Sequence, residues 1–203
     1  MKKVNQKTKK VEREMDVVFL LDRSGSMHGV ENDTIGGYNS YLKSLKGSNI
    51  KITTILFDDK YEVITDRCPL EKVKELNNDV YYVRGCTALL DAIGKTIINL
   101  ERKITNKVLF VITTDGLENA SHEFNKDKIK KMINEHQDWE FMYIGADIDS
   151  YSEGESIGIN HHNIANYEKS CGGISKLFAS IGKASKCMYE ENTINDDWKE
   201  ELK

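Results

Sequence analysis

The chain has 203 residues and a formal net charge of −4, with 39% hydrophobic and 31% charged residues. This is the composition of a soluble globular protein, and the length suffices for one ordinary domain with a sizeable core. The apolar runs are too short to span a bilayer, and the negative net charge gives no general attraction to nucleic acid. We therefore expect one globular domain with no membrane or nucleic-acid partner.

The two ends of the chain differ in composition from the middle. Residues 1–13 are basic and lack a hydrophobic period, which predicts a flexible tail, and no apolar stretch of the signal-peptide type accompanies them. The four cysteines form no C-x-x-C pair, so we expect free thiols and a cytoplasmic protein. Residues 191–203 are mostly polar, with Trp198 as their one aromatic residue, and are predicted to be a C-terminal tail, which leaves residues 14–190 as the domain.

Predicted strands and helices alternate along this domain. Apolar runs predict strands at residues 15–21, 51–57, 107–114 and 139–146, and a further strand at 61–65 forms a hairpin with 51–57. Helical spacing predicts helices at about residues 33–46, 87–100, 126–136 and 174–188, and a short one that starts at Ser150. Thr34 or Asp33 is the expected cap of the first helix, and Ser150 with Glu153 has capping-box spacing.

This order of elements predicts an α/β fold. The strands at 16–21 and 107–114 are apolar on both faces, as is typical of a parallel sheet covered by helices on each side. Right-handed crossovers place the carboxyl ends of all parallel strands at one edge of the sheet. Open sheets of this kind bind their ligands at that edge.

Polar side chains follow the first strand at this edge. The segment "DRSGS" at residues 22–26 comes directly after "MDVVFLL". Residues two apart point the same way in an extended chain, so Asp22, Ser24 and Ser26 can direct three oxygens at one point, while Gly25 lets the backbone bend. Three hard oxygen ligands suit Mg²⁺, Mn²⁺ or Ca²⁺.

A second strand and a loop add oxygen donors to the same edge. "VLFVITTDG" ends in Asp115, and a divalent cation would relieve the repulsion between two carboxylates at neighbouring strand ends. "VRGCTALLDAIG" places Thr87 just before a helix, where its hydroxyl is free to bind a metal. The predicted metal-site residues are Asp22, Ser24, Ser26, Thr87 and Asp115.

Taken together, the motifs resemble a known family. D-x-S-x-S at 22–26, Gly-x-Thr at 85–87 and T-D-G at 114–116, in this order, are similar to the metal-ion-dependent adhesion site of von Willebrand factor type A (vWA) domains. The resemblance covers roughly residues 15–188 and is to the stand-alone bacterial and phage members. It implies a doubly wound, mostly parallel central sheet with one short antiparallel edge strand and helices on both faces. The hairpin "ILFDDKYEVIT" would supply that edge.

The resemblance also implies a way of binding. Ser24, Ser26 and Thr87 would ligate Mg²⁺ directly, with Mn²⁺ or Ca²⁺ as substitutes, and Asp22 and Asp115 would act largely through water. A metal held by neutral hydroxyls keeps positive character and an open coordination position. An Asp or Glu of a partner protein would fill that position, so we expect a metal-dependent protein-binding module and no catalysis.

The same residues have two other interpretations, a structural turn and an enzyme site. Asp and Ser favour turns, but a turn at residues 22–26 would not account for Thr87 and Asp115 in matching positions. The alternative function is a Mg²⁺-dependent phosphotransfer or hydrolase enzyme with Asp22 at the strand end. Such an enzyme normally carries a second carboxylate two residues on, where this chain has Ser24.

The sequence leaves the partner and the pathway open. It does not distinguish a protein that works alone from a subunit of a larger assembly. It contains no P-loop, so any nucleotide-driven work would need another protein.

Overall fold

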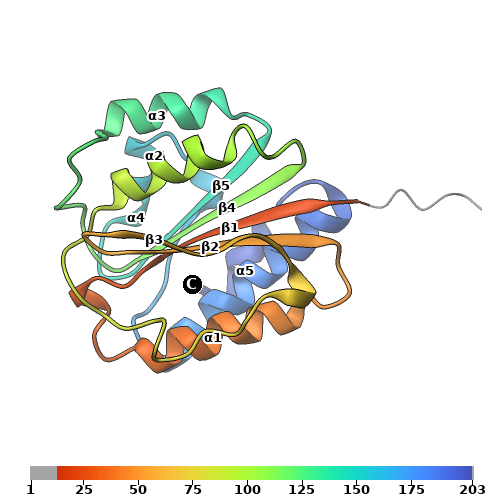
Figure 1. The fold of residues 1–203 in the computed structure, drawn as a ribbon, viewed down its shortest axis with the longest axis horizontal. Coiled ribbons are helices and arrows are strands. Elements are labelled where there is room, and N and C mark those ends of the chain that lie inside the picture. Colours follow the sequence, from red (N-terminus) through yellow and green to blue (C-terminus); the bar gives the residue numbers. More distant parts are fainter. Residues whose placement is uncertain (1–12, 203) are drawn as a thin grey trace, which may run out of the picture.

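The centre of the molecule is a twisted sheet (Figure 1). The computed structural model describes residues 13–202, and within them the sheet has six strands in the order β3-β2-β1-β4-β5-β6. The strands are β1 (Met15–Asp22), β2 (Ile50–Phe57), β3 (Tyr61–Pro69), β4 (Lys107–Thr114), β5 (Trp139–Gly145) and β6 (Ile164–Asn166). Each pairs in parallel with its neighbours except β3, which pairs antiparallel with β2. The predicted mostly parallel sheet with one antiparallel edge strand is confirmed.

Helices cover both faces of the sheet (Figure 1). They are α1 (Glu31–Ser44), α2 (Leu89–Leu100), α3 (Lys126–Glu135), α4 (Ser150–Ser156) and α5 (Cys171–Glu191). α1 and α5 pack on one face, where the side chains of Val17, Phe19 and Leu21 belong to their core. α2 and α3 pack on the other face against Val18 and Leu20. Alternate residues of β1 therefore belong to two different cores, as the period of an extended chain requires.

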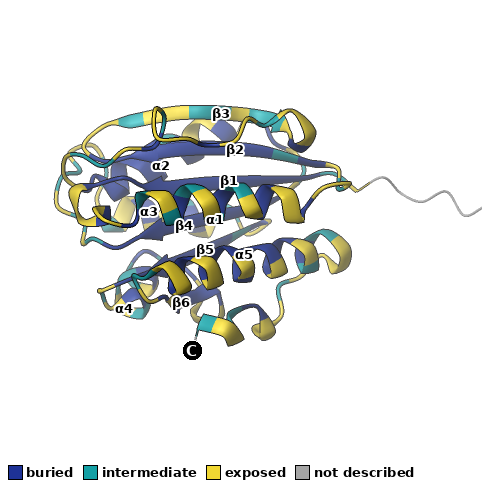
Figure 2. Ribbon diagram, turned by 90° about the horizontal axis from the view of Figure 1, so that it is seen from below, coloured by how far each residue is buried: buried dark blue, intermediate teal, exposed yellow. Residues whose placement is uncertain are grey.

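β1 is buried along its whole length because it lies between the two cores, with one on each face of the sheet. Phe19 contacts the rings of Tyr38 and Tyr41 edge-on, at centroid distances of 5.5 and 4.8 Å. Figure 2 shows the inner strands buried and the outer faces of α1 and α5 exposed, while β3 is largely accessible at the edge. The apolar runs of the inner strands are thus explained by burial on both faces.

Two local expectations were wrong, and one strand was missed. α1 begins at Glu31, and the Thr34 amide already donates to the Val30 carbonyl, so Thr34 lies inside the first turn and caps nothing. α4 is capped by Asp149, whose carboxylate accepts a hydrogen bond from the Ser152 amide at 3.1 Å, and not by Ser150. The three-residue strand β6 was missed because it is too short to show a period.

The C-terminal end of the chain also differs from the predicted tail. Residues 196–202 form a 3₁₀ helix in which Trp198 is 1% exposed and donates from Nε1 to the His162 carbonyl at 3.1 Å. Much of the predicted C-terminal tail thus packs on the domain. Residues 1–12 of the predicted N-terminal tail, and Lys203, lie outside the described residues.

Two further expectations concern thiols and membranes. All four cysteines are free, as predicted. In residues 13–202, no helix is both long enough and apolar enough to cross a membrane.

Candidate metal centre

The predicted site residues gather where the strand order changes direction. β1 lies between β2 and β4, and the helices that follow β1 and β4 leave on opposite faces of the sheet. β1 ends at Asp22, and Asp115 directly follows β4. A doubly wound sheet has a crevice at such a point, outside the carboxyl ends of its strands.

Three hydroxyl groups converge in front of Gly116. A Cβ atom placed on this glycine would lie 3.0 Å from Thr87 Oγ1, 3.1 Å from Ser26 Oγ and 3.8 Å from Ser24 Oγ. The two serine hydroxyls are 2.9 Å apart. Oxygens from two separate loops therefore line the position of a side chain at residue 116, which Gly116 leaves open because it has no Cβ.

Asp22 stands behind these hydroxyls and organises its neighbours. Its side chain is buried, with Oδ1 accepting from the Ser24 amide at 2.7 Å and Oδ2 accepting from the Thr114 hydroxyl at 2.5 Å. Burial raises the pKa of Asp22 to about 6, although the hydrogen bonds from Thr114 and Ser24 oppose this shift. A cation nearby would lower that pKa again by favouring the charged form.

Asp115 closes the site on the β4 side. Its Oδ1 accepts a 2.5 Å hydrogen bond from the Ser26 hydroxyl. Its Oδ2 is buried and meets Lys169 Nζ at 2.8 Å as an ion pair, and it accepts no well-directed hydrogen bond from the described residues. An acidic oxygen in this position retains the capacity to bind a cation or a water molecule.

Lys169 is the site residue that the sequence did not indicate. It follows β6 and also donates from Nζ to the Ser26 carbonyl. It lies 143 positions from Ser26 in the chain. No motif or spacing could have placed it here, because its segment carried no recognised strand.

Thr87 is held in place by the loop that follows Asp115. Asn119 Oδ1 accepts from the Thr87 amide at 2.9 Å, and the Asn119 amide donates to the Thr87 carbonyl at 3.0 Å. Glu118 accepts from the amides of Leu90, Ala120 and Ser121 at 2.9, 2.9 and 2.7 Å, which ties the same loop to the first turn of α2. These pairings fix the Thr87 hydroxyl relative to Asp115.

A buried ion cluster supports the other side of the site. Arg23 is fully buried, and Asp58 Oδ2 accepts from Arg23 Nε at 2.9 Å and from Arg84 Nε at 2.7 Å. The Arg84 amide donates to the Arg23 carbonyl at 2.9 Å, and the Gly25 amide donates to the Gly85 carbonyl at 3.1 Å. The loop that carries Thr87 is thereby fastened to the D-x-S-x-S loop.

The donor set suits a hard cation. In the described part of the chain, no three His, Cys, Asp or Glu side chains cluster as a metal site would require, so a metal would depend on hydroxyl oxygens and two carboxylates. Such oxygens favour Mg²⁺, Mn²⁺ or Ca²⁺ over soft metals. The space in front of Gly116 and the acceptor capacity of Asp115 Oδ2 both fit an ion of this kind.

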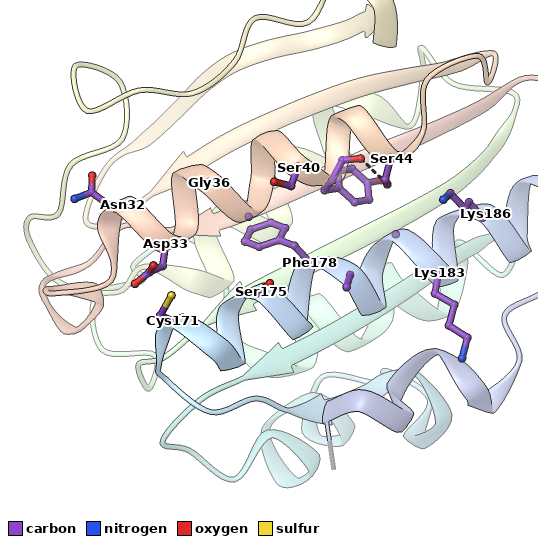
Figure 3. Close-up of a pocket in the computed structure, with 14 residues that line it drawn as sticks. Asn32, Asp33, Gly36, Ser40, Ser44, Cys171, Ser175, Phe178, Lys183 and Lys186 are labelled. Carbon is purple, nitrogen blue, oxygen red and sulfur yellow. Dashed lines mark hydrogen bonds between the residues drawn. The ribbon is translucent and has the colours of Figure 1, made fainter.

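A separate groove of about 600 Å³ runs between α1 and α5 (Figure 3). Small residues of α1, such as Gly36 and Ser40, face Ser175 and Phe178 of α5 across it. None of the five predicted metal-site residues lines this groove. It is therefore a feature distinct from the candidate metal centre.

Comparisons with known proteins give no match from sequence and clear matches from structure. No family model and no curated protein matches the chain. One match is proximal thread matrix protein 1 from the mussel byssus, whose structure has a zinc-occupied metal-ion-dependent adhesion site (MIDAS) motif. Its TM-score is 0.66, with 14% identity over 86% of this chain and 46% of that one. The vWF domain of the type V pili tip protein Mfa5 from Porphyromonas gingivalis matches with a TM-score of 0.67 and 10% identity over 92% of this chain and 99% of that one.

The fold and the edge at which the motifs gather define a doubly wound α/β protein with a candidate site at its switch point. More specifically, the chain has the fold of a von Willebrand factor type A domain. A von Willebrand factor type A protein from Catenulispora acidiphila also matches, with a TM-score of 0.62 and 12% identity over 86% of this chain and 43% of that one. The chain spans less than half the length of the mussel and Catenulispora proteins.

Proposed function

We propose that this protein is a metal-dependent protein-binding module. Ser24, Ser26 and Thr87 would ligate a divalent ion directly, and Asp22 and Asp115 would stabilise its charge from behind. The observation that carries this proposal is the convergence of the three hydroxyl oxygens on the space in front of Gly116.

Mg²⁺ is the proposed ion, with Mn²⁺ or Ca²⁺ as substitutes. Hydroxyl and carboxylate oxygens are hard donors, whereas zinc sites are usually built from imidazole and thiolate. The zinc of the mussel structure belongs to that protein, and it supports a divalent ion at this position of the fold. Neutral ligands and retained water molecules predict weak binding of the ion by the protein alone.

The proposed partner is a protein that presents an Asp or Glu to the ion. Neutral hydroxyl ligands leave the ion positive, so an anionic group is the favoured additional ligand. Two exposed apolar side chains accompany the site: Leu117, 56% exposed, follows Gly116, and Tyr82, 44% exposed, lies in the loop that leads to Thr87. Exposed aromatic and aliphatic side chains beside a specific polar anchor are typical of protein-binding surfaces.

The enzyme alternative is less well supported. Asp22 is buried, and its two oxygens accept hydrogen bonds from the Ser24 amide and the Thr114 hydroxyl, which disfavours nucleophilic attack by this carboxylate. The matched structures include a pilus tip protein, a minor pilin and a thread matrix protein, and none of these names denotes an enzyme. Metal-dependent phosphatase turnover that disappears in Asp22→Asn would overturn this proposal.

A cytoplasmic location and a place within a larger assembly complete the proposal. The free cysteines are compatible with a reducing compartment. The experiment that tests the function is a pull-down from the source cell with the wild-type chain, in Mg²⁺ and in chelator. A partner retained in Mg²⁺ and released by chelator is expected. A partner retained equally in both would show that the metal is not the recognition element.

A further inference from the structure

Lys169 occupies a fixed position beside the candidate metal centre. It lies in the short connection between β6 and α5, and the next residue, Ser170, is the N-cap of α5. The Ser170 hydroxyl accepts from the Gly173 amide at 3.1 Å. This cap fixes the backbone next to Lys169. The Lys169 side chain therefore extends to the site from a segment that is separate from the three motif loops.

The ammonium group of Lys169 contacts two residues of the predicted metal site. Nζ lies 2.8 Å from Asp115 Oδ2 and donates to the Ser26 carbonyl. The carboxylate of Asp115 is fully buried, whereas the Lys169 side chain is 22% exposed. This contact therefore differs from an ordinary surface ion pair, in which both partners are solvated.

An ammonium and a divalent ion have conflicting requirements at this position. Both are cations, and both are attracted to the acidic oxygens of Asp115. An ion held by the hydroxyls of Ser26 and Thr87 would be repelled by the ammonium, and the repulsion is strong where solvent is partly excluded. The lysine side chain is long and flexible, so it can swing into solvent when the charge beside Asp115 changes.

We propose that Lys169 is a tethered cation that competes with the divalent ion for the candidate metal centre. Metal binding then requires displacement of the Lys169 ammonium from Asp115, and the lysine sets how much metal the protein needs. The inference rests on one part of the proposed function, namely that the site binds a divalent ion. The opposing interpretation is a purely structural ion pair, which joins the β6–α5 connection to the end of β4 and leaves metal affinity unchanged.

The test is calorimetric titration of the full chain with Mg²⁺ and with Mn²⁺. Lys169→Met removes the charge and keeps much of the side-chain length, and it should bind both ions roughly ten- to a hundredfold more tightly than the wild type. Lys169→Arg keeps the charge and should stay close to the wild type. Lys186→Met is the matched control, because Lys186 is exposed near the other end of α5, and it should leave the affinity unchanged.

A second measurement follows the lysine itself. Trace acetylation with acetic anhydride, quantified by mass spectrometry, should label Lys169 several-fold more slowly than Lys186 in chelator, because its amine is ion-paired. Saturating Mg²⁺ should raise the labelling of Lys169 and leave that of Lys186 unchanged. Labelling of Lys169 that does not respond to an amount of Mg²⁺ shown by calorimetry to saturate the site would overturn the inference.

The outcomes separate this inference from the proposed function. Equal metal affinity in the wild type and Lys169→Met, with lower thermal stability of the variant, refutes the tethered cation and leaves the metal site standing. Metal binding by Lys169→Met alone supports strong competition by the lysine. Absence of binding in both proteins refutes the inference and the proposed metal site together.

Discussion

The Thr114 hydroxyl donates a 2.5 Å hydrogen bond to Oδ2 of the buried Asp22 carboxylate and so joins the ends of β4 and β1. This bond crosses the switch point of the sheet. It orients Asp22 so that the other carboxylate oxygen can hold the Ser24 amide. The shape of the D-x-S-x-S loop therefore depends on a side chain of the neighbouring strand.

Removal of this bond should weaken the domain. Thr114→Val keeps the shape of the side chain but leaves Asp22 Oδ2 without its donor, and we expect a loss of roughly 1–3 kcal/mol in the free energy of unfolding. Urea denaturation in chelator measures it. Thr113→Val is the matched control, since the Thr113 hydroxyl makes only a 3.4 Å contact with the Leu20 carbonyl and should lose less. Equal losses in both variants would contradict this role of Thr114.

The partner should be lost with the metal ligands. Thr87→Ala and Ser26→Ala each remove a proposed direct ligand, and chelator removes the ion. Each change should weaken partner binding by about 2–5 kcal/mol, the typical loss when one side of a buried charged contact is deleted. Ser175→Ala, an exposed serine of α5, is the control that should bind normally. Binding that survives chelator and every substitution of an acidic residue in the partner would place recognition on another face.

The apolar rim should contribute to partner binding and not to metal binding. Leu117→Ala and Tyr82→Ala should each weaken partner affinity by about 1 kcal/mol or more, because truncating a buried interface anchor typically has such an effect. The metal affinity should remain unchanged in calorimetry. Ile98→Ala removes an equally exposed apolar side chain from α2 and serves as the control. An unchanged partner affinity in both rim variants would exclude these side chains from the interface.

Asp91 should contribute stability at neutral pH and lose that contribution in acid. Burial acts to raise the pKa of Asp91, but the amides of His122, Phe124 and Glu123 outweigh it and hold the pKa below its ordinary value. Because the folded-state pKa is below the unfolded one, the stabilisation is fully present above the unfolded pKa, near 4, and disappears as the pH falls through the folded pKa.

The corresponding comparison uses Asp91→Asn. At pH 5–7 the variant should be less stable than the wild type by roughly 1.5–3 kcal/mol, the usual range for hydrogen bonds to a charged group. The difference should shrink below about pH 4, where the wild-type carboxylate takes up its proton. Urea denaturation at a series of pH values measures it. A difference that stays constant down to the acid limit would show that the charge of Asp91 is unimportant.

Local patterns predicted the frame of the molecule well. Each of the elements β1, β4 and α2 could be predicted from its own residues. The buried residues of β1 and β4 form apolar runs, and those of α2 recur at helical spacing. Asp22 and Asp115 could be placed together because parallel strands deliver their carboxyl ends to the same edge. Ser24 and Ser26 followed from the short distance between them in the chain.

Contacts between distant segments could not be predicted in this way. Lys169 meets Ser26 and Asp115 only because the unrecognised strand β6 adds to the edge of the sheet. Trp198 becomes a core residue only because its 3₁₀ helix folds back onto α5 and β6. In both cases the sequence shows the side chain but not the surface that receives it.

The most direct test of the metal centre is a Mg²⁺ titration of Gly116→Ala, measured by calorimetry beside the wild type. The new Cβ would lie 3.0 and 3.1 Å from the Thr87 and Ser26 hydroxyls and would fill the proposed position of the ion, while all five predicted site residues remain. Gly36→Ala is the control, because a Cβ there meets nothing within 4 Å. We predict that the wild type and Gly36→Ala bind one Mg²⁺ weakly and that Gly116→Ala, like Asp22→Ala and Asp115→Ala, binds none while remaining folded. Undiminished binding by Gly116→Ala, or no binding at high Mg²⁺ by both the wild type and Lys169→Met, would contradict the site.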